Sequence, residues 1–246
     1  MAPLQKMPQI VIPTTFLKKF GKQWKVNGER LKRSQPESSM QFGRMFDDVI
    51  AESLARMLGG LPIETPSRTA LTPAKADCVE KGDVRIIGGV RPHNFDIGYR
   101  PDGVRIAYDS KTLNDSKSVR KNYQNMINDL ATEATTIHTR FPYAIFALLV
   151  VIPAPCLGGA IENALTLTLE RLTQRELFSD PPHLAEAGAL VVWDPASGKI
   201  LPDRPGQESN LRIEKFHVGV ERIYRQRYKG LPPHVEAPEA DDEAEE

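Results

Sequence analysis

The sequence predicts an α/β fold in which helices flank a mixed β-sheet. Helical periodicity alternates along the chain with short β-type runs, two of these runs are joined as a hairpin, and two later runs are apolar on both faces. The order is helix, hairpin, helix, buried strand, helix and strand, which is not a series of identical βαβ units. With 246 residues, 40% of them hydrophobic, the chain can build such a domain around a sizeable core.

The N-terminal part should be a basic arm followed by a helix. Residues 1–39 are rich in proline, lysine and arginine and show little periodicity, so we expect an arm with room for one short helix. Apolar residues recur at helical spacing over Met40–Leu58, which predicts the first strong helix. Ser38 or Ser39 can cap this helix, and Gly59-Gly60 should end it. Residues 61–76 contain three prolines and should form a loop.

The middle of the chain, residues 83–113, should be β structure. Val84–Ile87 is one short run, and a strand at Phe95–Tyr99 should pair with one at Val104–Leu113 through the turn Arg100-Pro101-Asp102-Gly103. The later predicted elements are a helix at Lys117–Thr139 capped by Ser116, a buried strand at Ala144–Ile152, a helix at Ile161–Phe178 and a buried strand at Ala189–Trp193. Ile213–Tyr228 fits either a strand or a helix, and residues 232–246 should form a disordered acidic tail.

Charge is distributed unevenly although the formal net charge is zero. Phe16–Arg33 carries seven basic residues and one acid, whereas Glu236–Glu246 carries seven acids and no base. The rest of the chain therefore has a basic excess, which points to an anionic partner. Cys78 and Cys156 lack metal-ligand spacing and should be free thiols, with a single disulfide as the alternative. No apolar run suits a signal peptide or a membrane span, so we expect a soluble, cytoplasmic protein.

The residues that carry chemistry lie on the predicted hairpin. Residues two apart in a strand share a face, so Asp109 and Lys111 should point the same way. A two-residue loop at Asp102-Gly103 would place Asp96 directly opposite Asp109. A three-residue loop with a glycine bulge would instead pair Asp96 with Tyr108, so the alignment needs a two- or four-residue loop or a compensating bulge.

Two carboxylates side by side repel each other unless a cation lies between them. Mg²⁺ is the natural occupant because it takes oxygen ligands and keeps several waters, and Mn²⁺ is a possible substitute. Lys111 would then orient or deprotonate a water, or stabilise charge on a phosphate. Metal and lysine acting on a phosphodiester is the chemistry of hydrolysis.

The spacing of Asp96 and Asp109-Ser110-Lys111 resembles the PD-(D/E)xK nuclease superfamily, to which most type II restriction endonucleases belong. The resemblance covers about residues 43–153, and it implies a restriction-endonuclease-like core within a single nuclease domain at residues 40–231. In this chain Phe95, rather than proline, precedes the first acid. The helix before the hairpin often supplies one more acid in this family, and here Asp47 matches that position, with Glu52 as the alternative.

What the resemblance implies is a Mg²⁺-dependent endonuclease that cleaves double-stranded DNA, commonly as a homodimer. Asp96, Asp109 and Lys111 would be catalytic, and Asp96 and Asp109 with Asp47 or Glu52 would bind the metal. One alternative is a non-catalytic nucleic-acid-binding protein on the same fold, in which these residues are structural. A nuclease of DNA repair or recombination is the other alternative.

Overall fold

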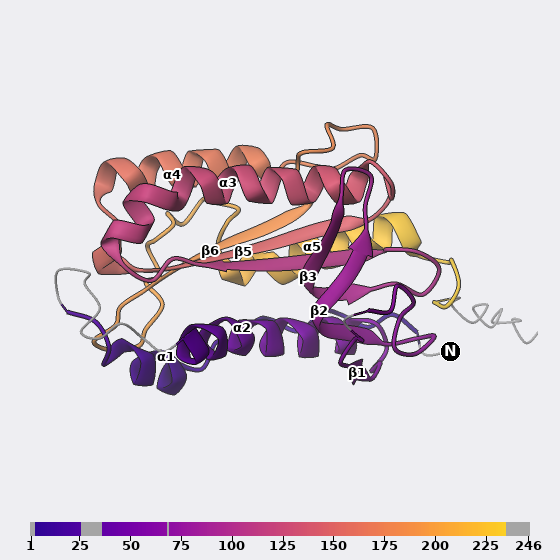
Figure 1. Ribbon diagram of the computed structural model, residues 1–246, viewed down its shortest axis with the longest axis horizontal. Helices are drawn as coiled ribbons and strands as arrows, with labels where there is room; N and C mark the ends of the chain where they lie inside the picture. The colour runs from indigo at the N-terminus through magenta and orange to yellow at the C-terminus, as the bar shows by residue number, and fades with distance from the viewer. Residues whose placement is uncertain (1–2, 26–35, 68, 235–246) are drawn as a thin grey trace, which may run out of the picture.

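Six β-strands form the centre of the computed structural model, which describes residues 3–25, 36–67 and 69–234 (Figure 1). The strands are β1 (Ile63–Glu64), β2 (Val79–Ile87), β3 (Pro92–Tyr99), β4 (Ile106–Thr112), β5 (Ile145–Pro153) and β6 (Ala187–Trp193). The helices are α1 (Thr14–Gly21), α2 (Pro36–Met57), α3 (Ser116–His138), α4 (Gly159–Leu172) and α5 (Ile213–Tyr228), with a 3₁₀ turn at Ala154–Cys156. The predicted α/β class with a mixed sheet is confirmed.

The strands lie in the sheet in the order of the sequence, from β1 to β6. β2, β3 and β4 pair antiparallel because short connections join them, whereas β4, β5 and β6 pair parallel. The helices α3 and α4 make the two crossovers that these parallel pairs require. Strands β2 to β4 therefore form an antiparallel meander and strands β4 to β6 a parallel αβ arrangement, while the short β1 pairs parallel with β2 at the edge.

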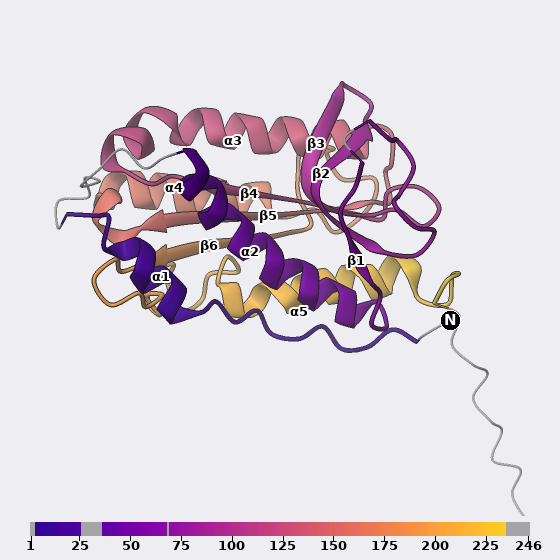
Figure 2. The same cartoon turned by 60° about the horizontal axis from the view of Figure 1, so that its bottom comes forward.

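Two helical layers cover the sheet. Figure 1 shows α3 and α4 on one face and α1, α2 and α5 on the other, and Figure 2 shows α2 crossing the sheet obliquely beside α5. Every residue of β5 and β6 is buried, as their continuous apolar sequences predict. Ile213–Tyr228, which the sequence left open, is a helix because its apolar stripe packs on the parallel half of the sheet.

A β-bulge lies opposite Asp96. Lys81 pairs with Ile97 and Val84 pairs with Phe95, so Gly82 and Asp83 together face the single residue Asp96. Gly82 has a φ of 120°, a conformation that suits glycine at such a bulge. A bulge of this kind bends the strand and redirects a side chain of the pair. It places Gly82 and Asp83 of β2 beside Asp96, and all three residues line one cavity.

The hairpin register matches the alignment that a two-residue loop would give, but the turn is longer. Ile97 pairs with Tyr108 and Tyr99 with Ile106, so Asp96 is the next residue in line with Asp109. The ladder stops at the Ile97–Tyr108 pair, and residues 100–105 connect the strands. The expectation of strand structure from Val104 onward is wrong, because β4 begins at Ile106.

The N-terminal segment packs against the domain, which the prediction of an arm did not anticipate. Met7, Ile10, Leu17 and Trp24 are buried in the common core, and α1 lies within this segment. The predicted helix at Ile161–Phe178 is also too long, since α4 ends at Leu172. A loop follows, held by the guanidinium of Arg175, which donates to several of its backbone carbonyls.

The remaining boundaries concern the chain end and the membrane. The acidic tail predicted at residues 232–246 lies outside the described residues from position 235 onward, but His234, within its predicted start, is buried against Tyr99 and Tyr224. Cys78 and Cys156 are free and buried. In the described part of the chain, none of the helices combines the length and the apolar character that crossing a bilayer requires.

Candidate active site

Strand β4 sends its alternate side chains toward the two helical layers. Asp109 and Lys111 form an ion pair with each other, which confirms that they share a face. Lys111 Nζ also lies 2.9 Å from Glu133 Oε1 on α3, so this face is the one that α3 covers. Ser110 points to the opposite face, where its hydroxyl contacts Asp47 on α2.

The α3 side of the site holds a second acid and a histidine. Glu133 is 2% exposed, and its Oε1 lies 3.2 Å from His93 Nε2 on β3. Although burial raises it, the pKa of Glu133 is lowered overall by His93 and Lys111. Burial acts to lower the pKa of Lys111, but Asp109 and Glu133 raise it well above its usual range. The lysine is therefore a firmly charged ammonium held between two carboxylates.

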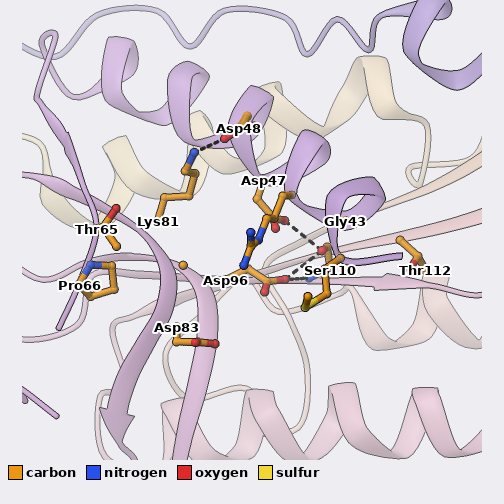
Figure 3. Close-up of a pocket in the computed structure, with 13 residues that line it drawn as sticks. Gly43, Asp47, Asp48, Thr65, Pro66, Lys81, Asp83, Asp96, Ser110 and Thr112 are labelled. Carbon is orange, nitrogen blue, oxygen red and sulfur yellow. Dashed lines mark hydrogen bonds and ion pairs between the residues drawn. The ribbon is translucent and has the colours of Figure 1, made fainter. Parts of the chain in front are cut away.

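On the α2 side, one hydroxyl lies between two carboxylates. Ser110 Oγ is 3.0 Å from Asp47 Oδ1 and 2.9 Å from Asp96 Oδ2, and the Ser110 backbone N–H donates to the same Asp96 oxygen at 2.8 Å (Figure 3). A hydroxyl has one proton and can donate to one carboxylate at a time. The contact with Asp47 therefore needs a proton on that carboxyl group or a cation nearby.

The raised pKa values of the buried acids agree with a shortage of protons around Ser110. Burial and the neighbouring Asp96 raise the pKa of Asp47 to about 8. Burial and Asp96 also raise the pKa of Asp109 well above its ordinary value, while Lys111 acts in the opposite direction. Asp96 thus contributes to the raised pKa of Asp47 on the α2 side of the sheet and to that of Asp109 on the α3 side. The three carboxylates form a site with too little positive charge for all of them to ionise.

A cavity of about 640 Å³ opens beside Asp47 and Asp96. It lies between α2 and the bulged part of β2 (Figure 3). Its other polar lining residues are Arg44, Asp48, Thr65, Lys81, Asp83, Ser110 and Thr112. Lys81 pairs with Asp48 at its wall. Glu52, the alternative to Asp47 as the third predicted ligand, is exposed and does not line this cavity.

The donor set suits a hard divalent cation, although the side chains are not arranged as a closed metal cage. Within residues 3–25, 36–67 and 69–234, no group of three or more His, Cys, Asp or Glu side chains has a metal-ligand arrangement. Mg²⁺ commonly uses only one or two carboxylates and keeps several waters. Asp96 and Asp47, which contact the same Ser110 hydroxyl at the cavity, satisfy that smaller requirement, so these residues fit the ion.

Three contacting residues were not among the sequence-predicted site residues. Ser110 lies on β4 between Asp109 and Lys111, and His93 lies on β3 ahead of the strand predicted at Phe95–Tyr99. Glu133 could have been found from the helical pattern, because it lies three residues after Leu130 and four before Ile137 on the apolar stripe of α3. An acid on such a stripe must have a buried partner.

No protein-family model matches the chain, and no curated protein or solved structure matches it.

Proposed function

We propose that the protein is a Mg²⁺-dependent endodeoxyribonuclease with a restriction-endonuclease-like fold. One observation carries the proposal. The Asp96 carboxylate lies opposite a β-bulge and shares the Ser110 hydroxyl with the buried acid Asp47, and Lys111 pairs with the buried Asp109 two residues before it on β4. Burial, together with Asp96, raises the pKa values of both Asp47 and Asp109. Buried acids that oppose one another without compensation are typical of sites that bind a cation.

The order of elements supports the same proposal. A helix, α2, precedes the hairpin and contributes Asp47, the helix α3 follows Lys111, and the buried strand β5 comes next. This is the arrangement that the resemblance of residues 43–153 to the PD-(D/E)xK superfamily implies. Restriction enzymes of that superfamily commonly cleave duplex DNA as homodimers. We extend both properties, a double-stranded DNA substrate and a homodimeric state, to this chain as parts of the proposal.

Each side chain has a definite role in this proposal. Asp96 and Asp109, with Asp47, would hold Mg²⁺, which when bound polarises a phosphoryl oxygen and lowers the pKa of a water. Lys111 would place its ammonium against the phosphate and the attacking water. Ser110 holds the Asp96 carboxylate in place through its backbone N–H and its hydroxyl. The cavity leaves room for a sugar-phosphate segment to reach Asp47 and Asp96, which line it, whereas Asp109 and Lys111 do not.

Incubation of the full chain with supercoiled plasmid, with Mg²⁺ or with EDTA, tests the proposal. We expect nicking and linearisation with Mg²⁺, none with EDTA, and none from Asp109→Asn. Asp203→Asn is the matched control, because Asp203 is an exposed acid of a distant loop and its variant should cut normally. Discrete fragments from a defined DNA would indicate a restriction enzyme, whereas a smear or structure-dependent cutting would indicate a repair or recombination nuclease.

A second candidate is a DNA-binding protein without catalysis. It is favoured by the contacts of Lys111, which is paired with Asp109 and Glu133 on the α3 side while Asp47 lies on the α2 side. Such an arrangement can serve as a structural ion cluster. Binding of duplex DNA with no metal-dependent nicking at any Mg²⁺ or Mn²⁺ concentration would identify this second candidate.

A further inference from the structure

Glu133 is the buried acid of the site that the proposed function leaves without a role. It lies on α3, is 2% exposed, and contacts Lys111 of β4 and His93 of β3 through the same oxygen, Oε1. Its Oε2 is buried and has no hydrogen-bond partner among the described residues. A carboxylate in such surroundings costs stability unless its charge is needed there.

The ammonium of Lys111 has two carboxylate partners, and this number matters for the metal. Asp109 pairs with Lys111, but Asp109 is also a proposed metal ligand. A carboxylate that neutralises a lysine competes with a metal ion for the same oxygens. Glu133 contacts the same ammonium from the other side of the helix–sheet interface, 2.9 Å away. It can keep the lysine neutralised while Asp109 turns to a cation.

We propose that Glu133 is a positioning residue that neutralises and holds Lys111 in place of Asp109, so that the Asp109 carboxylate is free to bind the divalent cation. This inference rests on the proposed function, because it assigns Asp109 to Mg²⁺. His93 Nε2 holds the same Glu133 oxygen and keeps the carboxylate directed toward the lysine. Without Glu133, Lys111 would pair with Asp109 alone, and the metal would have to displace the Lys111 ammonium from the Asp109 carboxylate.

Calorimetric titration of the full-length protein with Mg²⁺ alone tests the inference without relying on cleavage. Glu133→Gln should raise the Mg²⁺ concentration at half-saturation on the order of tenfold, as is usual when a partner of a metal ligand is lost. Glu133→Asp, which keeps the charge, should recover part of the affinity. Asp129→Asn is the matched control, because it removes one negative charge from the exposed side of the same helix and should bind Mg²⁺ like the wild type.

A double-mutant cycle distinguishes positioning from direct ligation. In a Lys111→Met background no ammonium competes for Asp109, so adding Glu133→Gln should leave the Mg²⁺ affinity unchanged. A tenfold loss that persists there would make Glu133 a ligand itself and overturn the inference. If Glu133→Gln does not fold, the comparison of Glu133→Asp in the two backgrounds decides in the same way.

The remaining outcomes separate this inference from the proposed function. A wild-type protein that binds Mg²⁺ and cuts DNA, with a Glu133→Gln variant of unchanged Mg²⁺ affinity, overturns the role of Glu133 and leaves the nuclease proposal intact. A wild-type protein that neither binds Mg²⁺ nor cuts DNA overturns both.

Discussion

Two of the clusters of buried charge in this domain are built in opposite ways. In the antiparallel half, Lys111 pairs with Asp109 and Glu133 on the α3 side, while Asp47 and Asp96 share the Ser110 hydroxyl on the α2 side, where Lys81 pairs with Asp48. In the parallel half, one carboxylate, Glu186, is surrounded by positive groups. The first cluster contains more carboxylates than positive groups, whereas the single carboxylate of the second cluster has positive groups around it.

Glu186 has a donor for each oxygen. Its Oε1 lies 2.9 Å from Arg175 Nε and 2.8 Å from Arg227 Nη1, and its Oε2 accepts from the Phe146 backbone N–H at 2.8 Å and lies 3.1 Å from His138 Nε2. These partners come from α3, β5, α5 and the loop after α4. The cluster therefore ties distant parts of the chain together, which is the role of a structural ion network.

The difference teaches how to separate structure from function among buried ions. A carboxylate with a donor for each oxygen, such as Glu186, has a structural role, because it joins the elements that supply those donors. The site around Asp96 instead carries electrostatic strain, and strain of this kind persists at functional sites because the rest of the fold stabilises it. Substitutions should therefore have opposite effects on stability in the two clusters.

The largest effect is expected at Glu186. Glu186→Ala leaves Arg175 and Arg227 buried without their common anion, and breaking a buried pair in this way costs about 3–5 kcal/mol. Urea unfolding followed by circular dichroism measures this loss. Arg222→Ala is the control, since Arg222 and Glu176 form an exposed pair that contributes little. Equal stabilities of the two variants would remove the structural role assigned to Glu186.

The next effect concerns catalysis. Lys111→Ala keeps the proposed metal ligands but removes the ammonium, so cleavage should fall by about 10²–10³-fold, as when one preorganised donor to developing charge is lost. DNA affinity should remain, because it comes mainly from many phosphate contacts elsewhere. Plasmid cleavage and a gel-shift titration measure the two quantities. Wild-type cleavage by a variant that binds DNA normally would make Lys111 structural, like Glu186.

A smaller effect, of opposite sign, is expected at Asp47. Burial and Asp96 raise the pKa of this acid to about 8 in the folded protein, above its ordinary value of 3.8. The folded state therefore holds the proton more tightly, and the stability contribution of Asp47 falls as the pH rises from about 4 to about 8. The asparagine of Asp47→Asn cannot ionise. At pH 8 without metal, the free energy of unfolding of this variant should therefore exceed that of the wild type by at least about 1.4 kcal/mol, the equivalent of one pKa unit.

Thermal melting at pH 5 and pH 8, with and without Mg²⁺, checks this prediction. The advantage of Asp47→Asn should shrink at pH 5, where the wild-type carboxyl also keeps its proton. Mg²⁺ should raise the melting temperature of the wild type more than that of the variant. An Asn variant that is less stable than the wild type at pH 8 would show that Asp47 is satisfied, as Glu186 is.

Local sequence patterns were sufficient where one strand or helix decides the geometry. Alternation along β4 predicts that Asp109 and Lys111 share a face, and their ion pair confirms it. Continuous apolar sequences predict the buried strands β5 and β6. That Asp96, Asp109 and Asp47 share a metal ion stays a prediction.

Features that depend on two distant segments could not be predicted in this way. The bulge opposite Asp96 arises from how β2 pairs with β3, and Gly82 was its only local sign. The N-terminal segment has no periodicity, yet Met7 and Trp24 are buried because other elements leave room for them. Its basic residues from position 26 to 33 lie outside the described residues.

The smallest effect compares one glycine from each half of the molecule. Gly43 lies within α2 at the wall of the cavity, and a Cβ built there would meet no atom within 4 Å outside the neighbouring helix backbone. Gly43→Ala should therefore stabilise the protein by about 0.5–1 kcal/mol, since glycine inside a helix is less favourable than alanine by that amount. At Gly188 on β6 the same Cβ would lie 2.5 Å from Thr173 Cγ2 and 3.0 Å from Leu148 Cδ1, so Gly188→Ala should destabilise the protein. Urea midpoints of the two variants measure both signs.

Because the cavity remains wide beside an added methyl group, Gly43→Ala should also bind DNA like the wild type. A destabilised Gly43→Ala would mean that the space next to Asp47 is filled in the free protein, and the site would then be packed as tightly as the parallel half.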